Sequence, residues 1–185
     1  MILPAPVFVG FFPKATLPSP AWLAAPGVQE IASVSCCLSP APDGWITHWR
    51  HNALGFYAGE AAALSVCTGE PAAFDLYAYA LYPLRGVDGR AVPFTIAVDA
   101  GAPPADYLFL GYDIVTKSTG DFFECSPLSC NGAAAAFGAN AFCLLDGAAE
   151  AAQALLVMSE PAAGFEPGPC YLFQVYRKAR IFSQA

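Results

Sequence analysis

Apolar and polar positions divide this chain into short strands and a few short helices. Val7 to Phe12 is a continuous apolar run that is typical of a buried strand, and residues 31–37 alternate in a way that predicts a second strand. Further strands are predicted at 74–84, 92–98, 107–116, 141–145 and 170–176, with a turn at 87–89 and helices at 45–52, 60–66 and 147–158.

The order of these elements lacks regular β-α-β alternation, which argues against a doubly wound sheet. We therefore expect an α+β protein whose mostly antiparallel sheet carries a few short helices packed on one face. Prolines and glycines interrupt the chain as loops rather than as linkers, and we detect no internal repeat. The length of 185 residues suits a single domain over residues 1–185.

The composition is rich in apolar residues and poor in charges. Hydrophobic residues make up 56% of the chain and charged residues 12%, about half the usual ~25%. Some apolar surface should therefore remain exposed, which favours a homo-oligomer or a protein partner. Trp45, Trp49, Tyr112 and Phe123 are candidates for an exposed aromatic face, and plain core packing is the alternative for all four.

Charge and cysteine usage exclude several classes of protein. The net charge is −7 and only three of eight basic residues cluster, at 177–180, so we expect no nucleic-acid binding. Apolar runs are broken before they reach the length of a membrane span, and the apolar N-terminus lacks the basic start of a signal peptide. An odd number of cysteines, seven, with two of them adjacent, does not suit a secreted disulfide framework, so we expect a reducing cytoplasm.

The segment 123–132 contains the most plausible site. Ser126 is a natural N-cap, Pro127 a natural first helical residue, and Asn131-Gly132 a natural stop, which predicts one helical turn after a strand. Cys125 is the best candidate for a reactive thiol, and Cys130 can serve as a second ligand or a resolving thiol. Packed, inert cysteines are the alternative. The candidate ligand-binding residues are Tyr112, Asp113, Glu124, Cys125, Ser126, Ser129, Cys130 and Asn131.

Histidines and carboxylates add further possibilities. His48 and His51 are three residues apart on the predicted helix, so with Cys125 and Cys130 they can form a His2Cys2 zinc site; packing between tryptophans is the alternative. Asp113, Asp121 and Glu124 can form a carboxylate pair, or simply cap turns and face solvent. Cys36 and Cys37 are expected on opposite faces of a strand. No cofactor fingerprint is present, and no catalytic residue can be assigned.

The stretch Leu110 to Val115, followed by 123–132, resembles a family of bacterial proteins with no known activity. The downstream stretches 142–146 and 166–169 belong to the same pattern, which covers only the C-terminal part of the chain. The resemblance implies a compact bacterial cytosolic domain and carries over no functional residue. The leading hypothesis is a non-enzymatic binding or interaction protein, such as an accessory or immunity-like factor. The alternatives are a metal- or thiol-dependent site on Cys125 and Cys130, and a hydrolase or transferase with a cysteine or carboxylate centre.

Overall fold

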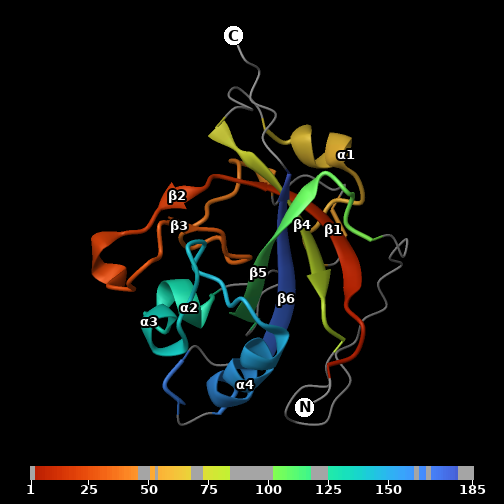
Figure 1. Ribbon diagram of the computed structural model, residues 1–185. Helices are drawn as coiled ribbons and strands as arrows, with labels where there is room; N and C mark the ends of the chain where they lie inside the picture. The colour runs from red at the N-terminus through yellow and green to blue at the C-terminus, as the bar shows by residue number, and fades with distance from the viewer. Residues whose placement is uncertain are drawn as a thin grey trace.

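A central four-stranded antiparallel sheet organises the protein in the computed structural model (Figure 1). The structure describes residues 3–45, 51–52, 54–67, 73–83, 102–117, 125–160, 163–165 and 168–178. The strand order is β1 (Val7–Lys14), β4 (Asp75–Leu81), β6 (Cys170–Lys178) and β5 (Tyr107–Thr116), and a second sheet pairs β2 (Leu17–Pro18) with β3 (Glu30–Ile31). The predicted α+β class with a mostly antiparallel sheet is confirmed.

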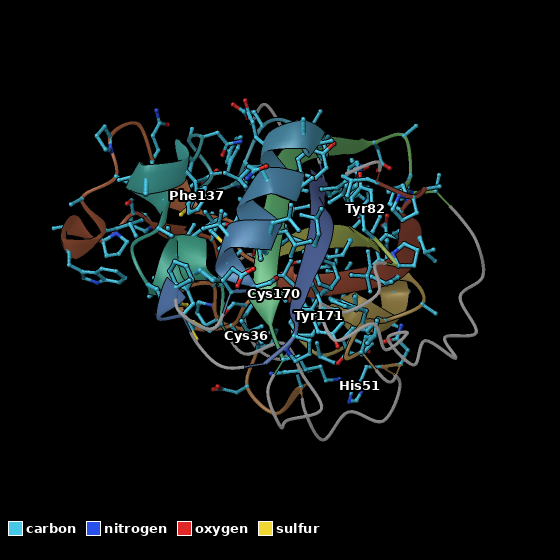
Figure 2. The ribbon with its side chains drawn as sticks, turned by 90° about the horizontal axis from the view of Figure 1, so that it is seen from below. Cys36, His51, Tyr82, Phe137, Cys170 and Tyr171 are labelled. Carbon is cyan, nitrogen blue, oxygen red and sulfur yellow. The ribbon has the colours of Figure 1, made fainter. Side chains whose placement is uncertain are left out.

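Short helices pack against this sheet. The helix α1 (Glu60–Leu64) contacts β1 and β4, whereas α2 (Pro127–Cys130) contacts β5 and the neighbouring α3 (Ala134–Phe137). The longest helix, α4 (Ala148–Met158), lies across β5 and β6 (Figure 2). Its buried residues Ala151, Ala154, Leu155 and Met158 recur every three or four positions, so one stripe of the helix faces the core. A single 3-10 turn, Ala21–Leu23, follows β2.

Side chains on the two faces of the sheet belong to two hydrophobic clusters. In β6, Phe173 and Val175 belong to a cluster that includes residues of β1, β4 and α1. Their neighbour Leu172 points the other way, into a cluster with residues of α2 and α4. Residues 32–36 run across the face of the sheet to which Phe173 points, because Ala32 and Val34 are buried in the same cluster as Phe173.

The predicted strands near residues 7–12, 74–84, 107–116 and 170–176 are confirmed, as are the helices near 60–66 and 147–158. The predicted strands at 31–37 and 141–145 are wrong. Residues 34–39 form consecutive bends, and residues 141–144 form turns and bends that end in an isolated bridge between Leu145 and Tyr112. Most of the predicted helix at 45–52 and all of 87–89 and 92–98 lie outside the described residues; His51 itself forms a β-bridge with Tyr57.

The structure contains an internal repeat that the sequence analysis missed. The first half contains β1, an asparagine loop, α1 and β4 in this order, and the second half contains β5, an asparagine loop, α4 and β6 in the same order. Other short elements lie between the first strand and the loop in each half, namely β2 and β3 in the first and α2 and α3 in the second. The sequences agree locally, since residues 52–59 read Asn-Ala-Leu-Gly-Phe-Tyr-Ala-Gly and residues 140–147 read Asn-Ala-Phe-Cys-Leu-Leu-Asp-Gly. The strand order β1-β4-β6-β5 therefore has an approximate two-fold axis between β4 and β6.

The two asparagines make equivalent hydrogen bonds. The Nδ2 of Asn52 donates to the carbonyl of Val9 at 2.9 Å, and its Oδ1 accepts from the amides of Leu54 and Phe56 at 3.0 and 3.1 Å. In the second half, Asn140 Nδ2 donates to the carbonyl of Leu110 at 2.8 Å. Its Oδ1 accepts from the amides two and four residues on, at 2.9 and 3.1 Å. Each asparagine thus fixes a loop against an edge strand.

A glycine at the bulge of each edge strand lets this loop approach. The pairing register shifts just before Gly10 in β1 and just before Gly111 in β5, and both residues have positive φ, at 127° and 143°. A Cβ on Gly10 would lie 2.4 Å from the carbonyl oxygen of Tyr57, and one on Gly111 would lie 2.8 Å from that of Leu145. No other residue type fits at these two positions without moving the loop.

Candidate metal centre

Three cysteines from two distant segments meet beside the end of β5. Cys37 belongs to the bends after β3, Cys125 precedes α2, and Cys130 ends α2. Their Sγ atoms all lie within 4.8 Å of one another. In the described part of the chain, this is the one group of three or more cysteine, histidine, aspartate or glutamate side chains close enough to hold a metal ion.

Backbone pairing places Cys125 and Cys130. The amide of Thr116 donates to the carbonyl of Cys125 at 2.8 Å, so the segment extends the edge of β5. One helical turn follows from Pro127, with Ser126 before it and Asn131 after it, as the sequence predicts. The hydroxyl of Ser126 does not cap this turn, however, because it donates to Asp113 at 2.6 Å.

Asp113 anchors both cysteine-bearing segments and is completely buried. Its Oδ2 accepts from the hydroxyl of Ser33 at 2.8 Å and from the amide of Val34 at 2.7 Å, while Oδ1 accepts from Ser126. The prediction of a turn-capping or solvated carboxylate is therefore wrong for Asp113. Burial raises the pKa of this carboxyl, and the hydrogen bonds from Ser126, Ser33 and Val34 oppose that rise.

Lys14 holds the same bends from the far edge of the sheet. It is 1% exposed, and its Nζ donates to the carbonyls of Ser33, Val34 and Ser35, each at 2.6 Å. Three donors thus meet three acceptors, which is the full bonding capacity of an ammonium group. Burial lowers the pKa of Lys14, and the charges of Cys36 and Asp113 act in the opposite direction. The segment that leads to Cys37 is therefore fixed by buried charges of both signs.

Polar groups surround the sulfur atoms. The hydroxyls of Ser35 and Ser129 lie 3.9 and 3.7 Å from Cys130 Sγ, and Asn131 Oδ1 lies 3.3 Å from Cys125 Sγ. Exposure rises across the cluster, because Cys125 is buried, Cys130 is half-buried and Cys37 is exposed. The three thiols therefore form a shallow site with a closed inner side and an outer side that reaches solvent.

Hydrogen bonds among the three thiols shift the pKa of each one. Hydrogen bonds from Cys125 and Cys130 lower the pKa of Cys37, with a smaller contribution from the charge of Lys14. The pKa of Cys125 is raised by its hydrogen bonds with Cys130 and Cys37 and by burial. For Cys130 the hydrogen bond with Cys125 lowers the pKa, but the bond with Cys37 and burial outweigh it. Hydrogen bonding within the cluster therefore lowers the pKa of Cys37 and raises that of Cys125.

Several sequence predictions change at this site. Cys37, and not Cys125, is the exposed cysteine of the cluster and the one whose pKa its neighbours lower, and the expected strand with Cys36 and Cys37 on opposite faces is replaced by bends. Cys36 instead packs against the first hydrophobic cluster. Tyr112 is buried on the opposite side of β5 from Asp113, in the second cluster, so it reaches neither the cysteines nor an exposed aromatic face.

His51 does not join the cysteines. The His51 ring lies 6.0 Å from that of Trp45 and 6.2 Å from that of Tyr57, and its Nδ1 is 3.0 Å from the carbonyl oxygen of Asn52. It is therefore not the predicted zinc ligand, and Figure 2 shows it apart from Cys36 and α2. Trp45 is half-buried and packs edge-on against Phe12. His48, Trp49, Asp121, Phe123 and Glu124 lie outside the described residues.

The residues that the sequence analysis missed had only weak signals. Cys37 was conspicuous as half of an adjacent cysteine pair, and Lys14 as a lone charge at the end of an apolar strand. Ser33 and Ser35 looked like the polar side of a strand, but both are buried and hold Asp113 and Cys130. Only the path of residues 32–37 across the sheet reveals these roles.

Comparisons with known protein families, with curated proteins and with solved structures find no match to this chain. Across the described ranges, no helix has the length and apolar character needed to cross a membrane. The seven cysteines all lie in those ranges and form no disulfide bond. The chemistry of the three-cysteine cluster therefore carries the functional argument.

Proposed function

We propose that this protein binds a thiophilic metal ion, with zinc as the first candidate, through Cys37, Cys125 and Cys130. The observation that carries the proposal is the approach of three Sγ atoms to within 4.8 Å of one another. A Zn–S bond of ~2.3 Å in tetrahedral geometry implies sulfur atoms about 3.8 Å apart. Small movements of the thiol groups are enough to close the cluster around an ion.

The surroundings of the cluster favour binding. Lys14 and Asp113 fix the segment before Cys37, and Asp113 also fixes Ser126 between the other two cysteines. Little ordering entropy then remains to be lost when the ion binds. The hydroxyls of Ser35 and Ser129 can donate to a metal-bound thiolate, which is the outer support that such ligands commonly have.

Charge balance points the same way. A divalent ion with three thiolates has a charge of −1, opposite in sign to the buried ammonium of Lys14, which interacts electrostatically with Cys37 and Cys130. Because a thiol must lose its proton to bind the metal, binding exchanges protons of the cluster for the ion. A reducing cytoplasm would keep the three sulfur atoms available for this exchange.

Metal analysis of single variants tests the proposal. The wild-type protein, purified without chelators, should contain about one zinc ion per chain. Cys37→Ser, Cys125→Ser and Cys130→Ser should each lose most of it, whereas Cys36→Ser and Cys170→Ser should keep it. Wild-type protein that neither contains zinc nor binds added zinc would refute the proposal, and so would equal losses in the two control variants.

An interaction surface is a second candidate, and one observation favours it. Leu108 and Phe109 lie side by side on the edge strand β5 and are 61% and 45% exposed. An edge strand with exposed apolar side chains is a common site of pairing with another chain. Light scattering of the wild type and of Leu108→Lys would test self-association. If the wild type stays monomeric at high concentration, this surface does not bind a second copy of the chain.

A further inference from the structure

The three-cysteine cluster supplies fewer ligands than a zinc ion takes. Zinc in proteins is nearly always four-coordinate, and sites with three protein ligands keep the fourth position for water or substrate. Among the described residues, no fourth cysteine, histidine or carboxylate lies within the cluster. Ser35, Ser129 and Asn131 contact the sulfur atoms at 3.3 to 3.9 Å, so they are hydrogen-bonding partners of the ligands rather than ligands themselves.

Within the described residues, the side of the cluster without a ligand is the one that faces solvent. Cys125 is 8% exposed, and Ser126 and Ser129 beside it are fully buried, so the inner side of the cluster is closed. Cys37, which comes from the other segment, is exposed. An ion held by all three sulfur atoms would therefore have its remaining position on the side of Cys37.

We propose that this fourth position accepts a small thiol from solution. The inference rests on the proposed metal binding and adds the chemical class of the exogenous ligand. Three thiolates make the ion a soft acceptor, for which sulfur is a better fourth ligand than the oxygen of water or of a carboxylate. In the exchange the bound water leaves, the sulfur of the thiol bonds to the metal, and the thiol proton goes to solvent.

Nearby groups can accommodate the added negative charge. The buried ammonium of Lys14 interacts electrostatically with both Cys37 and Cys130. The hydroxyls of Ser35 and Ser129 can turn their protons toward sulfur, since hydroxyl hydrogens rotate freely. The metal would then hold the incoming sulfur as a thiolate near neutral pH, which makes that sulfur a nucleophile.

Cobalt substitution of the full-length protein tests this inference. Co²⁺ replaces Zn²⁺, and the intensity of its thiolate-to-metal charge-transfer band grows with the number of sulfur ligands. Titration with 2-mercaptoethanol should raise that intensity by about one third, in a saturable way, as the number of sulfur ligands goes from three to four. Ethylene glycol, which has a hydroxyl in place of the thiol, should leave the spectrum unchanged.

The outcomes separate the two proposals. A cobalt protein without any charge-transfer band before thiol is added would overturn the metal-binding function itself. A band of three-thiolate intensity that does not change at saturating thiol, or that disappears because the thiol removes the ion, would overturn only the open position. Glu124→Gln and His48→Ala are the control variants. If either one gains a response to thiol that the wild type lacks, the chain itself fills the fourth position and the inference fails.

Discussion

Replacing Asn140 by alanine is expected to destabilise the protein through the loss of one side chain that holds a whole loop. Asn140 Nδ2 donates to the carbonyl of Leu110, and Oδ1 accepts from the amides of Phe142 and Leu144. Alanine removes these three bonds and a fourth, which Nδ2 donates to Oδ1 of Asp146 at 2.7 Å, and it leaves two backbone amides without their acceptor. The loop from residue 140 to Leu145 would then lose its support against the bulge of β5.

The magnitude follows from the number of bonds. A hydrogen bond contributes about 1 kcal/mol to the free energy of unfolding, and an abandoned partner in a half-buried site costs at least as much, so the loss should be about 3 kcal/mol. With an unfolding entropy of ~2.1 cal/mol/K per residue, that loss lowers the Tm by roughly 8 °C for a chain of this length. Because Asn52 makes three equivalent bonds in the first half, Asn52→Ala should cost about as much.

Urea unfolding of the wild type and both variants, followed by circular dichroism, measures these free energies. Two losses that agree to within about 1 kcal/mol would support the equivalence of the two halves. Asn52→Asp is a stringent companion, because it keeps both acceptor interactions and loses only the donor to the carbonyl of Val9. Losses below about 0.5 kcal/mol for both alanine variants would refute the reasoning, since ordinary surface substitutions have effects of that size.

Three further outcomes are expected. Gly111→Ala should cost more than about 3 kcal/mol, because its Cβ would lie 2.8 Å from the Leu145 carbonyl; Gly138→Ala, which has positive φ but open space around it, should cost only about 1 kcal/mol in the same unfolding assay. Lys14→Met should lower stability by about 3–5 kcal/mol and weaken zinc binding, since three buried carbonyls and a buried carboxylate lose their cation; calorimetry and metal titration would detect both. Burial raises the pKa of Cys143 to about 12, so this thiol stabilises the fold below its unfolded pKa of ~8.5 and that contribution falls as the pH rises toward 12. The wild type should therefore lose roughly 2–4 kcal/mol more than Cys143→Ala between pH 8.5 and 12, and parallel curves of stability against pH would contradict this.

Local patterns were sufficient for the regular elements. The apolar run in β1, the aromatic and apolar run in β5 and the alanine-rich stretch in α4 identify their own secondary structure, because period and propensity are properties of neighbouring residues. The predicted strand at 31–37 failed for the opposite reason. Its alternating serines are buried and form hydrogen bonds with Asp113 and with neighbouring backbone amides. The alternation therefore reflects these hydrogen bonds and not the two faces of a β-strand.

The internal repeat shows how geometry can be preserved with little sequence agreement. Gly55 and Cys143 occupy equivalent positions, and both have positive φ, at 86° and 61°. Only the first is a glycine, so the conformational signal that a glycine gives in a sequence is absent from the second half. Three identical residues in eight, spread over two loops, became meaningful once the equivalent hydrogen bonds of Asn52 and Asn140 were seen.

For the candidate site, the sequence by itself determined two of the three ligands. Cys125, Cys130 and the turn between them are local, because Ser126, Pro127 and Asn131 define one helical turn wherever it is placed. The third sulfur was decided only by the tertiary structure, in which Lys14 and Asp113 draw residues 33–35 across the sheet and bring Cys37 to α2. The physical reason is that Cys37 and Cys125 are nearly ninety positions apart, and their contact depends on the buried groups Lys14 and Asp113 in two different strands. A hydrophobic period along the chain carries no information about such a long-range contact.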